Sequence, residues 1–299
     1  MLKKQALKKI SITTLALFIV FLISLFPNNN QLNIEETITY QDTKDMIIYA
    51  PNNENYISRT NVFYNNDEIV PYIISMLKKD SQESSYLPSF LHPIIPKNTK
   101  IINYDIDKRT LKINFSKELL DIEEKDEEKL IESLIYSLCE QENIDNIIIF
   151  VEGNILNELP HSHKILNYPL DRSYGINKIY NINNIKDTKK TTLYYGSKYN
   201  DEYYYIPITK VSNNEINKVE IIVNELKNIP IYQTKLITFL NASYELTDYE
   251  ILENRINLSF NNNMLTGLKE DEKIEEVKYT LALSIRDTFN IDNIAINIT

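Results

Sequence analysis

The chain has 299 residues, of which 43% are hydrophobic and 25% charged, and these proportions are ordinary for a globular protein. Its formal net charge of −10 argues against nucleic-acid binding through a basic surface, so we expect no nucleic-acid partner. The chain has only four glycines, which excludes a glycine-rich phosphate loop, and its single cysteine excludes an intramolecular disulfide bond.

The N-terminus has the pattern of a membrane anchor. Four lysines (positions 3, 4, 8 and 9) precede an uncharged, largely apolar stretch at 10–26, which is close to the lower limit for a membrane span. A secretory signal has the same order of features, but no small-x-small cleavage site follows Phe26. No cysteine lies near the end of the stretch, so a lipid attachment there is excluded.

We therefore expect a cytoplasmic basic segment (1–9), a transmembrane signal anchor (10–26) and a polar tether (27–45). Because basic flanks stay in the cytoplasm, this arrangement predicts a single-pass protein of the cell membrane with most of its chain extracytoplasmic. If the N-terminal segment is cleaved, the same pattern predicts a secreted protein.

The chain after residue 45 begins with a predicted hairpin, helix, second hairpin, second helix and strand. Apolar runs around turn-forming residues mark the hairpins, and apolar residues three or four positions apart mark the helices. Leu130, Leu134 and Leu138 belong to the clearest helical stripe. The elements in chain order are 46–49 and 56–64, then 67–77, then 101–104 and 111–115, then 126–138, and finally 147–151.

The second half of the chain repeats this order, with elements at 192–195 and 203–211, 216–226, 244–249 and 256–260, 274–285, and 294–298. We therefore expect the α+β class, with two tandem small domains, each β-β-α-β-β-α-β with helices packed on one face of a sheet. The expected boundaries are 46–172 for the first domain, 173–190 for a linker and 191–299 for the second domain.

A repeated pentapeptide supports the division into two halves. Residues 143–147 read Asn-Ile-Asp-Asn-Ile, and residues 290–294, which lie 147 positions later, have the same sequence. Each copy follows an apolar-striped helical stretch and opens a run that is typical of a strand. We interpret the pentapeptide as a helix-to-strand junction that is used twice, with its isoleucines in two hydrophobic cores.

Longer stretches around the first copy resemble a known family. Residues 135–138, 143–147 and 151–153, the last reading Val-Glu-Gly, are similar to the helix-strand-Gly signature of GerM domains, and residues 95–100 and 111–116 fit the same pattern. The second half is similar in Tyr279-Thr280-Leu281 and in 290–294, but it lacks the Gly after its last strand. The resemblance therefore identifies a GerM domain followed by a GerM-like domain.

The resemblance implies a role in sporulation and spore germination, as a membrane-attached extracytoplasmic scaffold with a fold similar to ring-building domains of secretion systems. It implies other extracytoplasmic sporulation proteins as partners, with self-association into a ring as one mode of assembly, and no catalysis. Two other functions stay open from the residues: a module that binds peptidoglycan or another envelope polymer, and an envelope hydrolase.

No residue pattern predicts a catalytic, cofactor-binding or metal site. The three histidines are His92, His161 and His163, and the pair at 161 and 163 has no third ligand nearby in sequence. Cys139 falls in a predicted helix near its apolar stripe, where a small buried side chain is expected. The acidic runs 123–128 and 269–273 are typical of helix starts. A tyrosine-rich stretch at 194–205 predicts strand packing, with a binding surface as the alternative.

Overall fold

The computed structural model describes residues 44–64, 68–184, 186–200, 202–213, 217–228, 235–240, 243–261, 271–291 and 293–298. The chain divides into two compact units, residues 1–42 and 43–299, and all the described residues belong to the second. The predicted basic segment, signal anchor and almost all of the tether lie outside the described residues. Within the described ranges, no helix is long and apolar enough to cross a membrane.

The first half contains two hairpins, two α-helices and a further strand. Its elements are β1 (Lys44–Pro51), β2 (Ile57–Tyr64), α2 (Ile69–Leu77), β3 (Ile101–Asp107), β4 (Thr110–Phe115), α3 (Glu124–Leu138), β5 (Asn146–Val151) and the short β6 (Asn154–Ile155). The 3-10 helices η1 (Glu83–Tyr86) and η2 (Lys117–Leu120) lie in the loops between them. The acidic residues at 124, 126 and 127 open α3, where negative charge is favoured by the helix dipole.

The second half repeats these elements in the same order. They are β8 (Lys189–Tyr199), β9 (Glu202–Ser212), α4 (Lys218–Leu226), β10 (Leu246–Ile251), β11 (Arg255–Phe260), α5 (Asp271–Phe289) and β12 (Asn293–Ile298). Between the halves lie η3 (Arg172–Tyr174) and β7 (Ile179–Asn181). The segment expected to be only a linker therefore also adds a strand, because β7 pairs with β9 in parallel.

The α+β class is confirmed, but each half does not have a single sheet with its helices on one face. The second hairpin of each half joins the following strand in a separate sheet, β3-β4-β5-β6 in the first half and β10-β11-β12 in the second. The first hairpins meet in another sheet, in the order β1-β2-β9-β7 with β8 paired to β9. The sequence expectation missed this separation of the two hairpins.

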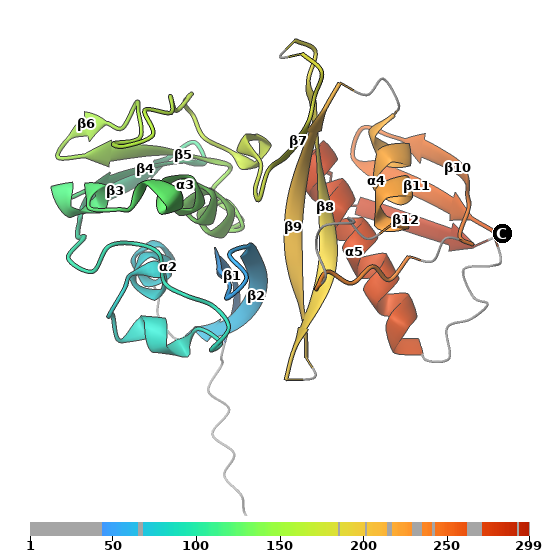
Figure 1. Ribbon diagram of the computed structural model, residues 1–299, viewed down its shortest axis with the longest axis horizontal. Helices are drawn as coiled ribbons and strands as arrows, with labels where there is room; N and C mark the ends of the chain where they lie inside the picture. The colour runs from blue at the N-terminus through green and yellow to red at the C-terminus, as the bar shows by residue number, and fades with distance from the viewer. Residues whose placement is uncertain are drawn as a thin grey trace, which may run out of the picture. The chain divides into compact units, whose positions relative to one another are not determined.

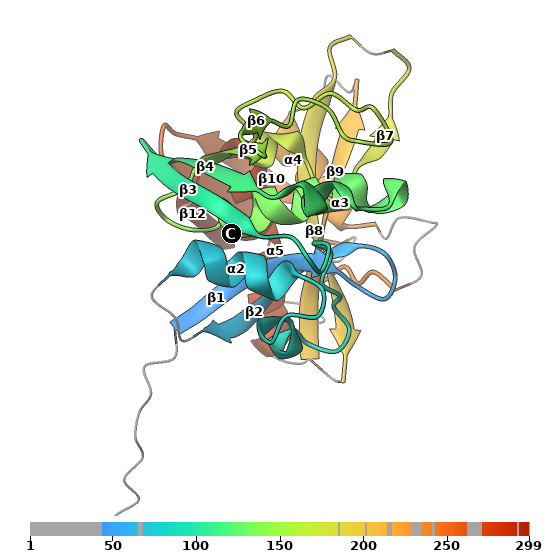
Figure 2. The ribbon, with the colours of Figure 1, turned by 90° about the vertical axis from the view of Figure 1, so that its left-hand side faces the viewer.

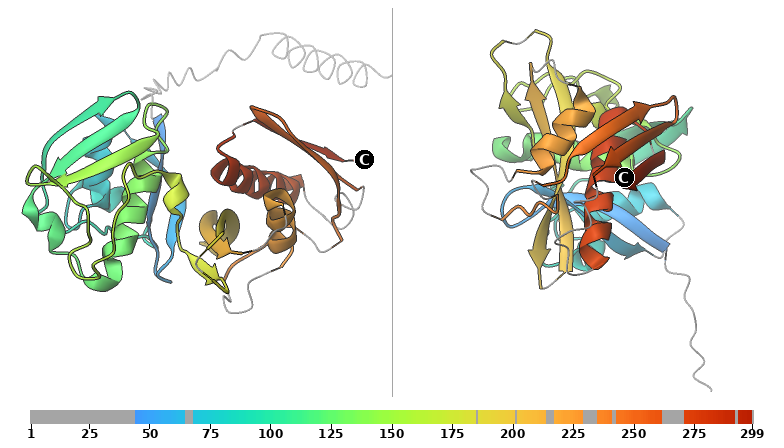
Figure 3. Two further views of the ribbon diagram at one scale, coloured as in Figure 1. Left: turned by 90° about the horizontal axis from the view of Figure 1, so that it is seen from above. Right: turned by 90° about the vertical axis from the view of Figure 1, so that its right-hand side faces the viewer.

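The helix α3 explains why the hairpins separate. All its residues from Leu130 to Leu138 are buried, so one covering layer is not enough. The helix contacts β1 and β2 as well as β5, and Figure 3 shows it beside the β1–β2 hairpin. In the second half, α5 contacts both β8 and β12, as Figure 1 shows. Each half is thus a hairpin and a small sheet with a helix between them.

The repeated pentapeptide lies at the same structural position in both halves. β4 and β5 pair in parallel with Leu111 opposite Ile147, and β11 and β12 pair in parallel with Ile256 opposite Ile294. Ile147 is fully buried, and Ile294 packs against the core. The interpretation of the pentapeptide as a helix-to-strand junction is confirmed.

The two halves meet through equivalent strands. β2 and β9 pair antiparallel, with Arg59 opposite Tyr205. The hairpin registers make β2 and β9 equivalent, because Tyr49 lies opposite Arg59 in one hairpin and Tyr194 lies opposite Pro207 in the other. A contact that joins the same element of two equivalent units in antiparallel fashion has two-fold character. The long strands β8 and β9 can be followed behind the first half in Figure 2.

Candidate functional site

Each half ties its first strand to its second helix by the same hydrogen bond. The Tyr49 N–H donates to Ser137 Oγ at 2.9 Å, and the Tyr194 N–H donates to Ser284 Oγ at 2.9 Å. The two serines are 147 positions apart, as are the two pentapeptides. Both bonds are buried, and each satisfies a strand N–H that no neighbouring strand reaches. The contact therefore belongs to the repeat.

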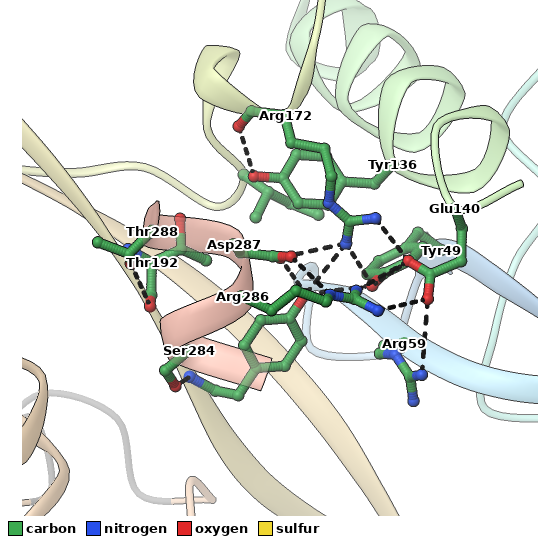
Figure 4. A network of polar contacts seen from close by, with 12 residues as sticks. Tyr49, Arg59, Tyr136, Glu140, Arg172, Thr192, Ser284, Arg286, Asp287 and Thr288 are labelled. Carbon is green, nitrogen blue, oxygen red and sulfur yellow. Dashed lines mark hydrogen bonds and ion pairs between the residues drawn. The ribbon is translucent and has the colours of Figure 1, made fainter. Parts of the chain in front are cut away.

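The two tyrosines also meet each other at the junction of the halves. Their hydroxyl oxygens are 3.1 Å apart (Figure 4). Tyr49 donates to Glu140 Oε2 at 3.4 Å, and Tyr194 donates to Asp287 Oδ2. These two carboxylates are again 147 positions apart. Equivalent tyrosine–carboxylate pairs from the two halves thus face each other across the approximate two-fold axis.

Arg172, from η3 in the connection between the halves, joins the two pairs. Its Nη1 lies 2.5 Å from Glu140 Oε2, and its Nη2 lies 3.1 Å from Asp287 Oδ2. Nη2 also donates to the Tyr49 hydroxyl at 2.8 Å. The guanidinium stacks over the Tyr136 ring at 4.7 Å from its centroid, and the Tyr136 hydroxyl donates to the Arg172 carbonyl at 2.9 Å. One side chain therefore holds acids from both halves.

Two further arginines complete this central network. Arg286 donates to both Glu140 oxygens, at 3.0 Å from Nη1 and 2.9 Å from Nη2. Arg59 Nη2 lies 3.8 Å from Glu140 Oε1. Three guanidinium groups thus surround two carboxylates whose side chains are only 6% and 1% exposed. Charges buried this deeply are stable only when they are paired and hydrogen-bonded, as they are here.

The central network keeps its charges fixed at neutral pH. Burial acts to raise the pKa of Glu140, but the positive charges of Arg172 and Arg286 outweigh it and lower that pKa to about 2. Burial raises the pKa of Tyr49, and it raises the pKa of Tyr194 well above its ordinary value. A charged carboxylate beside neutral phenols suits a permanent joint, and these three groups do not titrate near pH 7.

Two hollows lie near the network. One, of about 630 Å³, is lined by Glu140, Arg172, Arg286 and Asp287 and by neighbours on both halves. The other, of about 660 Å³, lies between β2, β9 and α5, and we call it the α5 groove. Its walls include Arg59, Thr60 and Asn61 of β2, Glu202 to Tyr205 of β9, and Glu275, Glu276, Lys278, Tyr279 and Ala282 of α5.

The predicted metal and nucleophile candidates stay apart from this centre. His92, His161 and His163 are exposed, and His163 Nδ1 contacts Glu158. Among the described residues, no group of three or more potential metal ligands comes together. Burial raises the pKa of the Cys139 thiol to about 12, so the thiol is protonated at neutral pH.

The first acidic run and the tyrosine-rich stretch have identifiable structural roles. Glu127, in the first acidic run, accepts the N–H groups of His161 and Ser162 at 2.7 and 2.9 Å and so fixes a loop onto α3. The tyrosine-rich stretch packs mostly inward, with Tyr194 fully buried, while Tyr203 is 40% exposed in the α5 groove. The expected strand packing thus holds for most of the stretch.

The residues of the central network were not predicted from the sequence. Arg172 lay at the edge of the expected linker, and Glu140 and Asp287 lay just past the helical stripes. A signal was available, because the 147-residue spacing of the pentapeptides also relates Ser137 to Ser284 and Glu140 to Asp287. Extending the repeat into the helix ends would have identified these polar pairs.

Comparisons with known proteins find a family, a curated relative and a solved structure that are similar to this chain. The family described as "Germane: Sporulation and spore germination" matches residues 40–157. The spore germination protein GerM of Bacillus subtilis (strain 168) is 27% identical over an alignment of 221 residues, and the match covers 72% of this chain and 60% of that protein's length. The first half of this chain thus matches the family model, and the aligned part of the chain is similar to GerM.

A solved structure extends the likeness to both halves of the chain. The tandem GerMN domains of the sporulation protein GerM from Bacillus subtilis superpose with a TM-score of 0.77 at 24% sequence identity. The superposition covers 86% of this chain and 91% of the other. The fold is therefore similar to that of the tandem GerMN domains, and the central network lies where the two halves join.

Proposed function

We propose that this protein acts in sporulation and spore germination as a membrane-anchored, extracytoplasmic assembly protein. The family and the curated relative support the role, and the basic-then-apolar N-terminal pattern supports the anchor. Its partners in this proposal are other extracytoplasmic sporulation proteins, with self-association into a ring as one form of assembly. The protein works by holding surfaces in place, without catalysing a reaction.

The observation that carries this proposal is the central network between the two GerM domains. Two flexibly linked domains could rotate independently, and such motion is the default for small polar interfaces. Here a buried arginine binds carboxylates from both domains, and β2 pairs with β9. The two domains therefore present their outer surfaces at fixed relative positions, as a scaffold requires.

A deletion in the bacterium that encodes the chain tests the role. We expect fewer heat-resistant spores or slower germination, restored by the wild-type gene and not by a variant lacking residues 1–26. A C-terminal tag on the full chain should be digested by protease added to intact protoplasts. Normal spore numbers with normal germination in the deletion strain would overturn the proposed role, and a protected tag would overturn the topology.

A second candidate, an envelope-polymer binding module, is favoured by the exposed tyrosines of the α5 groove. Tyr203 and Tyr279 are 40% and 38% exposed, and aromatic rings of this kind can stack on sugar rings. Incubation with purified cell-wall sacculi tests this candidate, since a binding module co-sediments with them. Replacing both tyrosines with alanine should abolish the co-sedimentation, and a protein that stays in the supernatant argues against the candidate.

A further inference from the structure

The connection between the domains fills a slot between α3 and the strands β2 and β9. Asn177 lies in this slot and binds two strands at once, with its Nδ2 donating to the carbonyls of Ile57 and Pro207 at 2.7 Å each. Its Oδ1 accepts from the Ile57 N–H at 2.9 Å. The neighbouring Ile176 is fully buried, and its N–H donates to Thr209 Oγ1 at 2.9 Å. The segment thus follows β9 and ends in β7.

Acidic residues on α3 form the other wall of this slot. Glu132 accepts from the Asn177 N–H at 2.9 Å and from Lys178 Nζ at 2.5 Å. Glu128 lies 2.7 Å from the same Nζ. The Lys178 side chain is only 6% exposed, so its charge is held almost entirely by these two carboxylates. The slot therefore selects an extended segment that carries a basic residue.

The repeat relates this slot to the α5 groove on the second domain. Positions on α3 correspond to α5 at a spacing of 147, and the hairpin registers relate β2 to β9 at a spacing of 148. The five residues that contact the segment in the slot are Ile57, Pro207, Thr209, Glu128 and Glu132. On the strands, Ile57, Pro207 and Thr209 correspond to Tyr205, Arg59 and Asn61. On the helices, Glu128 and Glu132 correspond to Glu275 and Tyr279. All five counterparts line the α5 groove.

The α5 groove is thus the second copy of a site whose first copy is filled by the chain itself. No described segment of the chain occupies it. Glu275 is the counterpart of Glu128, one of the two acids that bind Lys178 in the first slot. Glu202 and Glu276 add two carboxylates to the wall of the groove. Glu275 pairs with Lys278, but both side chains are well exposed, at 73% and 44%, so this pair is weak and can exchange partners.

We propose that the α5 groove binds an extended segment of a partner protein that carries a basic side chain. This inference rests on the proposed assembly role, because it gives the chemistry of one partner contact. The acidic side chains of the groove provide the kind of contact that holds Lys178 in the first slot, and its tyrosine rings add apolar walls. The backbones of Arg59 and Tyr205 pair with each other, so the proposed segment is held in the groove by side chains.

A labelled peptide tests the groove directly. The probe is a fluorescein-labelled synthetic peptide with the sequence of residues 174–181 (Tyr-Gly-Ile-Asn-Lys-Ile-Tyr-Asn), titrated against the full-length protein in detergent by fluorescence anisotropy. We expect saturable binding that weakens about tenfold when the lysine of the peptide is replaced by glutamate. Binding should also weaken at high salt, because it depends on charge.

Variants of the protein locate the binding. Ala282→Trp fills the groove, and Glu275→Lys reverses the charge of the acid that corresponds to Glu128, so each should weaken binding about tenfold. The matched control is Glu253→Lys, which makes the same charge change at an exposed position outside the groove and should leave binding unchanged. Circular dichroism confirms that each variant is folded.

The proposal fails if the peptide does not bind, or if both groove variants bind it as well as wild type does. It also fails if a tetramer of N-acetylglucosamine binds in the groove in place of the peptide, since the site then recognises a sugar. Peptide binding with normal sporulation of the deletion strain would keep the groove and overturn the assembly role. A sporulation defect without peptide binding would keep the assembly role and overturn the proposal for the groove.

Discussion

The two halves, or domains, of the chain have the same scaffold but differ in what covers it. In the first domain, β5 pairs with β6 and bridges to Leu170, and residues 175–178 fill the slot beside α3. In the second domain, the described part of the chain pairs β12 with β11 alone, and none of its segments fills the α5 groove. The differences therefore arise from the connecting segment, which follows the first domain and can cover only one of two equivalent surfaces.

The side chains at the junction show which positions the repeat keeps. Tyr49 and Tyr194 correspond, as do the serine and carboxylate pairs of the central network. By contrast, Cys139 in the first domain corresponds to Arg286 in the second. Arg286 therefore gives Glu140 an additional cation from the other domain. The equivalent position in the first domain is Cys139, which supplies no charge to Asp287. The joint is thus symmetric in its hydrogen-bond framework and asymmetric in its charge.

The largest predicted effect is a buried charge placed in either core. Leu134→Asp and Leu281→Asp change equivalent, fully buried positions, and each should destabilise the protein by about 5 kcal/mol or more. Because the junction couples the domains, we expect each variant to remove the same cooperative transition in urea unfolding followed by circular dichroism. Separate transitions for the two domains would show that the junction does not couple them, and an unchanged midpoint for Leu134→Asp would contradict the assignment of α3.

Arg172→Met comes next in expected size. It removes one of the two arginines that contact both Glu140 and Asp287, and breaking a buried charge pair costs about 4 kcal/mol. Thermal unfolding measures this loss. The matched control is Arg109→Met, which breaks an exposed pair with Asp145 and should change the midpoint little. Equal effects of the two variants would mean that Arg172 does not hold the domains together.

Acid should weaken the joint through Glu140. Its pKa in the folded protein is about 2, below its ordinary value of 4.5, so its charge stabilises the folded state above about pH 4.5. That stabilisation, about 3 kcal/mol, is lost as the pH falls from 4.5 towards 2. Urea unfolding at pH 5, 4 and 3 measures the slope, which should be shallower in Glu140→Gln. An identical slope in the variant would contradict the shifted pKa.

The smallest predicted effect comes from the two equivalent serines. Ser137→Ala and Ser284→Ala each leave a buried strand N–H without its acceptor, which costs about 1 kcal/mol. Chemical denaturation of both single variants and of the double variant measures the two contributions and their coupling. A loss at only one of the two serines would show that this contact is not shared by the two domains.

The local elements were predictable because their signals are local. The apolar stripe from Leu130 to Leu138 predicted α3, and alternating residues predicted the hairpins to within a few positions. The pairing of β2 with β9 was not predictable in this way, since strand patterns say which residues face a core but not which strand lies alongside. Arg172 was missed for a related reason, because its role depends on acids more than 30 and more than 110 positions from it.

Because residues 175–178 fill one of two equivalent surfaces, the two halves of the molecule offer different surfaces to a neighbour. Two equivalent surfaces that were both open would let a molecule join neighbours from either side and grow equally both ways. In this molecule the connecting segment fills one of the two surfaces, which leaves the α5 groove to receive an extended segment of a partner. In the proposed assembly, each copy takes up one extended segment, and the stoichiometry and the polarity of the assembly are then set within the single chain.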